Sequence, residues 1–319
     1  MTTRTIAAAR GIVTGLALAA AALSPASAQP ISVLTGGSAG IYYPLGVTIA
    51  MIYADIPGSK VQVQTTDGSV ENLNRLQQGG AQVGFALGDS LRDAWAGDTE
   101  AGFTGKLDQL RVIGALYPSF IQIVATKASG IRTLADVRGK SLSVGAEKSG
   151  TELNARAILD AAGLGYRDLR KVEYLSFAES TALMRKKELD ATLQSAGLGV
   201  ASLRELSESA EITMVPVPKD VVAKMGAPFK PGTIPAKTYI GQDKDVPTAM
   251  VMNYLVTSAA VPDDLAYELT KRVFDSLPEL AIAHLVGGAI RRDTAAEGGP
   301  VPLHPGAIRY FREKGLLKQ

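Results

Sequence analysis

The chain alternates between short apolar runs, which predict strands, and stretches with an apolar residue at every third or fourth position, which predict helices. Strands are expected at 31–34, 61–65, 81–87, 111–117, 121–126, 141–145, 171–175, 190–194, 211–215 and 248–257. Helices are expected at 41–56, 70–78, 91–95, 149–162, 178–187, 198–207, 262–277 and 305–315. Strands separated in this way by helices are typical of βαβ units and of a mostly parallel sheet, so the fold class is α/β.

Local signals refine three places in this pattern. Pro118 interrupts an apolar region and predicts two strands, at 111–117 and 121–126, in place of one. Residues 219–239 contain several prolines and predict an irregular connection. Ser149 with Glu152 matches the S-x-x-E capping box at the start of a helix, and the glycine that follows residue 162 fits the position just past its end.

The first 28 residues are typical of a secretory signal peptide. Arg4 and Arg10 are basic, residues 12–23 are apolar, and Ala26-Ser27-Ala28 is a small-residue cleavage pattern. An apolar core of about 12 residues is too short to span a bilayer. We therefore expect export to the periplasm, with no membrane insertion after removal of the signal.

The composition excludes several classes of function. Removing Arg4 and Arg10 from the 33 basic residues leaves 31 basic against 31 acidic residues, and such a balance argues against a nucleic-acid partner. The chain has no cysteine, so disulfides, iron–sulfur clusters and thiol nucleophiles are excluded. Its two histidines, His284 and His304, make a transition-metal site improbable, and no metal or other cofactor is expected.

Small, hydroxyl-bearing turns open several of the expected helices. In open α/β sheets ligands bind beyond the carboxyl ends of strands, and a helix N-terminus with free N–H groups attracts an anion. Each turn alone also fits a plain helix cap, because Ser and Asp are favoured there. Together they predict a site for a small carboxylate. The turns are Gly36-Gly37-Ser38, Gly68-Ser69, Gly88-Asp89-Ser90 and Ser149-Gly150-Thr151.

Four ordered blocks carry a resemblance to a known family. They are TGGSAGIYYPLG at 35–46, TTDGSVENLNRLQQGGAQVGFALGD at 65–89, GKSLSVGAEKSGTELNARAILDAAGL at 139–164 and PLHPGAIRYFREKGL at 302–316. The chain resembles the TAXI family, the extracytoplasmic solute receptors of TRAP transporters. After the third strand family members often have Gln-Ser-Asp, whereas this chain has Leu87-Gly88-Asp89-Ser90.

The resemblance implies a type II periplasmic-binding-protein fold, in which two α/β lobes are joined by a hinge of two crossing strands. Lobe one would comprise residues 29–118 and 258–319, and lobe two residues 119–257. The ligand would be a small organic anion, either an acidic amino acid such as glutamate or a dicarboxylate such as 2-oxoglutarate. Closure of the lobes would trap it for delivery to a membrane permease.

Residues matching the family's site are carried over by position. The helix opened by Ser149 would be the main anion holder. Asp89 would favour an ammonium-bearing ligand if it faces the cleft, and a plain dicarboxylate becomes the better candidate if it only caps its helix. The predicted ligand-binding residues are Gly37, Ser38, Tyr42, Tyr43, Ser69, Asp89, Ser149, Gly150, Thr151, Ser195 and Tyr239.

Two other classes compete with this interpretation. Residues 36–40 match G-x-S-x-G, so Ser38 could be the nucleophile of a hydrolase with His284 or His304 as its base. No earlier segment of the mature chain supplies an oxyanion-hole loop, which disfavours an enzyme. The same fold would also serve the binding protein of an ABC-type importer or a periplasmic sensor.

Overall fold

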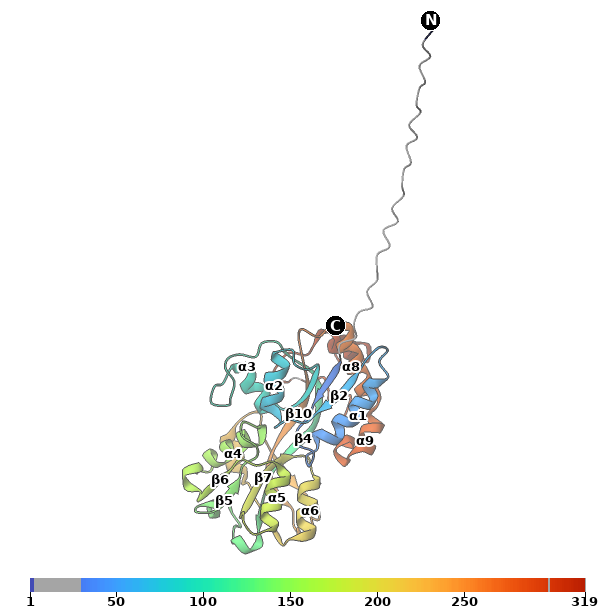
Figure 1. Ribbon diagram of the computed structural model, residues 1–319. Helices are drawn as coiled ribbons and strands as arrows, with labels where there is room; N and C mark the ends of the chain where they lie inside the picture. Colours follow the sequence, from blue (N-terminus) through green and yellow to red (C-terminus); the bar gives the residue numbers. More distant parts are fainter. Residues whose placement is uncertain (3–29, 298, 319) are drawn as a thin grey trace.

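The computed structural model describes residues 1–2, 30–297 and 299–318 (Figure 1). The predicted signal peptide falls almost entirely on residues 3–28, outside the described part. None of the described helices has the length and hydropathy needed to cross a membrane.

The described chain forms one mixed sheet with helices around it. The strands are β1 (Ile31–Leu34), β2 (Val61–Gln64), β3 (Val83–Leu87), β4 (Leu110–Thr126), β5 (Ser141–Ser143), β6 (Lys171–Glu173), β7 (Ala191–Ala196), β8 (Ile212–Val215), β9 (Lys230–Ile234) and β10 (Val246–Ser258). The helices are α1 (Tyr42–Ala54), α2 (Ser69–Gln77), α3 (Gly88–Ala96), α4 (Gly150–Ala161), α5 (Phe177–Arg185), α6 (Ala201–Ser209), α7 (Lys219–Met225), α8 (Asp263–Asp275), α9 (Leu277–Ala283) and α10 (Pro305–Glu313).

Two lobes share this sheet, which has the order β2-β1-β3-β10-β4-β7-β5-β6. In the first lobe β2, β1 and β3 are parallel, and in the second β7, β5 and β6 are parallel. The long strands β4 and β10 are antiparallel to each other and run from one lobe into the other (Figure 1). The two-lobed α/β architecture is therefore confirmed. The lobe boundaries after residues 118 and 257 remain predictions.

The expectation of two strands around Pro118 was wrong. Strand β4 continues through Pro118 to Thr126. Pro118 pairs with Met252 of β10 where the register shifts, and the pairing of β4 with β7 begins only at Phe120. A proline is tolerated there because its missing N–H falls at an irregular point of the ladder, next to a side without a partner strand.

The expected irregular connection at 219–239 also contains regular structure. Helix α7 begins after Pro218, and β9 follows at Lys230–Ile234. Pro231 lies within β9, which among the described strands pairs only with β10. The edge position explains how a proline fits, because no second neighbour needs its N–H.

Helix α1 packs closely on the sheet, and this packing positions the turn between β1 and α1. Leu45, Ile49 and Tyr53 of α1 are fully buried against the sheet. Gly46 lies between them, and a Cβ at this position would overlap the methyl group of Thr35, just past β1. The glycine lets helix and strand approach, which places the N-terminus of α1 at the carboxyl end of the sheet.

A buried polar contact joins α3 of the first lobe to α4 of the second. The Asn154 amide donates to the Asp89 carboxylate at 2.5 Å, and the Ser195 hydroxyl donates to the Asn154 carbonyl oxygen at 2.7 Å. Burial, reinforced by the nearby Asp93 carboxylate, raises the pKa of Asp89 to about 7, although Arg92 acts in the opposite direction. Burial therefore favours the protonated form of Asp89, whereas the Asn154 amide, as a donor, favours the carboxylate.

The raised pKa of the buried Asp89 predicts that the stability of the fold depends on pH. The folded chain keeps a proton on Asp89 that the unfolded chain loses near the ordinary Asp pKa of 3.8, so the stabilisation is present at low pH and disappears as pH rises through about 7. The free energy of unfolding, measured with urea at a series of pH values, should fall over this interval. The fall should be smaller in Asp89→Asn and unchanged in Asp55→Asn, a surface control. Parallel profiles for the wild type and Asp89→Asn would contradict the prediction.

Candidate functional site

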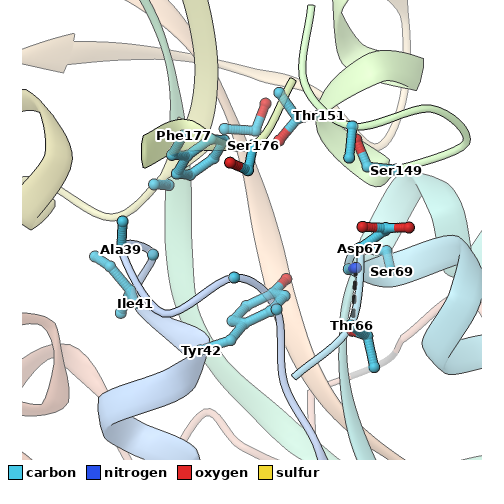
Figure 2. A pocket seen from close by; sticks show the side chains of 18 of the residues that line it. Ala39, Ile41, Tyr42, Thr66, Asp67, Ser69, Ser149, Thr151, Ser176 and Phe177 are labelled. Carbon is cyan, nitrogen blue, oxygen red and sulfur yellow. Dashed lines mark hydrogen bonds between the residues drawn. The ribbon is translucent and has the colours of Figure 1, made fainter. Parts of the chain in front are cut away.

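A cavity of about 210 Å³ lies between the two lobes (Figure 2). It is smaller than the roughly 300–1,000 Å³ typical of sites for drug-sized ligands, so it suits a small solute. The first lobe supplies the turns before α1 and α2 and the end of β3, while the second supplies the starts of α4 and α5 and the end of β7. Strand β4 contributes Tyr117 and Ser119.

The turn before α1 and the first residue of α1 form one wall of the cavity, and a contact to the crossing strand β10 holds this wall in place. The Gly40 N–H donates to the Gly37 carbonyl at 3.0 Å and closes the turn. Tyr42 stacks on Phe85 with ring centroids 4.8 Å apart. Its hydroxyl donates to Asn253 of β10 at 2.5 Å. Burial raises the pKa of Tyr42, so this side chain stays neutral.

Asn253 connects this wall to β4. Its amide donates to the Tyr117 carbonyl and to the Ser119 hydroxyl, both at 2.8 Å. Tyr42, Tyr117 and Ser119 all line the cavity. The buried side chain of Asn253 therefore positions three residues of the cavity wall. No local pattern singles out Asn253, which lies inside an ordinary strand pattern.

The wall before α2 is built around Asn72. The Asn72 amide donates to the Thr35 carbonyl at 2.7 Å and to the Phe85 carbonyl at 2.9 Å, which ties the ends of β1 and β3 together. The Thr66 hydroxyl donates to the Asn72 carbonyl oxygen at 2.8 Å. The Ser69 hydroxyl accepts the Leu87 N–H at 3.1 Å, which ties the start of α2 to the end of β3.

Helix α4 presents free donors from the second lobe. The Ser149 hydroxyl caps the helix by accepting the Glu152 N–H at 3.2 Å. The N–H groups of Gly150 and Thr151 stand in the first turn, where a helix offers no internal acceptor. The predicted capping box forms only in part, because the Glu152 carboxylate turns instead to Arg156 at 2.6 Å and Tyr166 at 2.7 Å. Both Gly150 and Thr151 line the cavity, so the first turn of α4 lies at its wall.

The start of α5 forms a further wall that our sequence reasoning missed. Ser176, Phe177 and Ala178 line the cavity. The Glu179 N–H donates to the Ser176 hydroxyl at 3.3 Å, and the Ser176 N–H donates to the Glu179 carboxylate at 3.0 Å. This is a complete S-x-x-E capping box, so the rule that selected Ser149 could have found it.

Eight of the predicted ligand-binding residues line the cavity, and their role in binding remains a prediction. They are Gly37, Ser38, Tyr42, Ser69, Ser149, Gly150, Thr151 and Ser195.

Tyr43, Asp89 and Tyr239 are not among the cavity-lining residues. Tyr43 is half-buried on α1. Asp89 is buried against Asn154 because it lies one position inside α3 and faces α4. The Tyr239 hydroxyl donates to Gln122 at 2.5 Å and accepts the Gly199 N–H at 3.2 Å, so it supports the second lobe from behind.

The lining of the cavity is mostly neutral. No arginine, lysine or histidine is among its lining residues, and Asp67 is the one ionisable carboxylate there. Within the described residues no group of three or more potential ligands could hold a metal ion.

The two histidines serve as helix caps and do not bond to Ser38. His304 Nδ1 accepts the Gly306 N–H at 3.1 Å, and His284 Nδ1 accepts the Val286 N–H at 3.2 Å. Each imidazole therefore has its Nδ1 engaged in local structure. In the part of the chain that the structure describes, neither histidine is hydrogen-bonded to Ser38, so the serine–histidine pair of the hydrolase alternative is not formed there.

The close fit around Gly150 gives a prediction about lobe closure. A Cβ at Gly150 would lie 2.7 Å from the Ser69 hydroxyl and 2.9 Å from both Leu87 and Ser90 of the first lobe. Gly150→Ala should therefore hold the lobes apart, increase the radius of gyration in small-angle X-ray scattering and weaken ligand binding. Gly165→Ala is the control, since nothing lies within 4 Å of its Cβ. Equal scattering profiles for both variants would contradict this prediction.

Comparison with solved structures identifies the fold. A periplasmic transporter matches with a TM-score of 0.58 and 11% identity over 90% of this chain and 93% of its own. The periplasmic binding protein BugD matches with a TM-score of 0.55 and 13% identity over 91% and 99%. A protein from Bordetella bronchiseptica RB50 matches with a TM-score of 0.52 and 19% identity over 90% and 82%. These similarities confirm the periplasmic-binding-protein fold.

The sequence itself also matches a family model, over residues 33–315. This range includes both lobes, both crossing strands and every turn that lines the cavity. The chain belongs to the NMT1-like family.

Proposed function

We propose that the protein is a periplasmic solute receptor that captures a small carboxylate between its lobes and delivers it to a membrane permease. The observation that carries this proposal is the convergence of hydroxyl and N–H donors from both lobes on one small cavity. The periplasmic location rests on the predicted signal peptide and on the fold, which this chain shares with periplasmic proteins.

The carboxylate is assigned to the N-terminus of α4. Gly150 and Thr151 offer N–H groups at the positive end of a 12-residue helix, and the Ser149 and Thr151 hydroxyls lie beside them. Hydrogen bonds to a charged group are worth roughly 1.5–3 kcal/mol each, so a few of them hold a small anion without a basic side chain. Contacts from the first lobe then favour the closed arrangement over an open one.

For the partner we propose the permease of a TRAP transporter, with the protein as its TAXI-type receptor. The support is the resemblance of four ordered sequence blocks. The alternatives with this fold are the binding protein of an ABC-type importer and a periplasmic sensor. Neighbouring genes separate them: a fused permease gene supports the TRAP system, whereas an ATPase gene supports the ABC system.

A ligand screen tests the binding function. Melting temperature and calorimetry should show binding of at least one acid among glutamate, glutamine, 2-oxoglutarate, fumarate and succinate. The double variant Ser149→Ala/Thr151→Ala should lose at least about tenfold in affinity, because two hydroxyl contacts to the carboxylate disappear.

The control for this screen is Ser209→Ala, an exposed hydroxyl whose proton is donated within α6. It should bind like the wild type. Unchanged affinity in the double variant would remove α4 from the site. Stabilisation by sugars or cations alone would refute the proposed carboxylate ligand.

A further inference from the structure

We propose that Asp67 selects ligands that carry an ammonium group, so that the cavity takes an amino acid in preference to a 2-oxo acid or a dicarboxylate. This inference rests on the proposed binding function and specifies its substrate class. Asp67 is not among the ligand-binding residues predicted from the sequence.

Asp67 is placed at the mouth of the cavity by the turn between β2 and α2. Figure 2 shows its carboxylate between Ser69 of the first lobe and Ser149 of the second. Gly68, with a φ of 112°, and the bond from its N–H to the Thr66 hydroxyl at 3.1 Å fix this turn. The position of the carboxylate therefore follows from backbone geometry that only glycine adopts readily.

The Asp67 carboxylate is available for a ligand. No hydrogen bond or ion pair to it is formed by the residues that the structure describes, although its own backbone N–H donates to Glu71 at 2.8 Å. Glu71, in contrast, is engaged, since it also pairs with Arg75 at 3.2 Å. A carboxylate beside a cavity and without a partner is suited to an incoming cation.

The electrostatic surroundings of Asp67 are negative from both lobes. Partial burial, followed by the charges of Glu71 on α2 and Glu179 on α5, raises the pKa of Asp67. No basic side chain lines the cavity to offset these charges. A dianion entering the cavity would meet repulsion here, whereas an ammonium group would relieve it.

The two ends of the cavity thus differ in the sign of their electrostatic potential. The α4 N-terminus supplies N–H donors for a carboxylate, and Asp67 supplies an acceptor for an ammonium group. An amino acid carries both groups on one carbon and satisfies both ends. Replacing the ammonium group by a carbonyl, as in a 2-oxo acid, leaves Asp67 without a donor and places two acceptors together.

Matched ligand pairs and one isosteric substitution test the inference. Calorimetry should compare glutamate with 2-oxoglutarate, and leucine with 4-methyl-2-oxopentanoate, because each pair differs only in the ammonium group. The wild type should prefer the amino acid of a bound pair by at least about tenfold. Asp67→Asn, which keeps the shape and removes the charge, should lose most of this preference by weakening amino-acid binding and improving 2-oxo-acid binding.

Asp55→Asn is the matched control, since it removes a carboxylate from the end of α1 away from the cavity lining. It should keep the wild-type preference. Equal binding of both members of a pair by the wild type, or an unchanged preference in Asp67→Asn, would overturn the role of Asp67 and leave the receptor function standing. Absence of binding for every acid in the wild type would overturn the receptor function as well.

Discussion

The antiparallel pairing of β4 with β10 is the constraint on which the rest of the structure depends. These strands are long enough to take part in both lobes, and their register runs from Leu110 and Ser258 at one end to Phe120 and Met250 at the other. Asn253 uses this pairing to connect Tyr42 with Tyr117 and Ser119. The floor of the cavity is therefore set by the same strands that join the lobes.

The cavity has a floor from the crossing strands and walls from both lobes. Each lobe has helices whose first turns face the other lobe, and helix starts expose N–H groups because the first turn lacks internal acceptors. The walls from α1 and α2 belong to one lobe, and those from α4 and α5 belong to the other. In the proposed function, a ligand that contacts both sets would stabilise the closed arrangement through its contacts with both lobes.

Two aspartates near this cavity, Asp89 and Asp67, have different environments. The carboxylate of Asp89 is buried between α3 and α4, where its raised pKa reduces the cost of burying it. Asp67 remains exposed at the mouth with its carboxylate free. The two acidic residues thus have different environments, because Asp89 lies inside the first turn of α3 and contacts α4, whereas Asp67 lies in the turn before α2.

The sequence by itself determined most of the alternation of strands and helices, the turns that open α1, α2 and α4, and the hydroxyl-rich chemistry of eight residues that line the cavity, but not α7 or β9. Periodicity, glycine turns and caps act between near neighbours, so they can be recognised locally. Only the tertiary structure decided that β4 continues through Pro118, that Asp89 is withdrawn from the cavity and that Asp67 faces it. The physical reason is distance along the chain: Tyr42 is fixed by a residue 211 positions away, and the partner of Asp89 lies 65 positions away in the other lobe. Such contacts exist only once the lobes have packed together.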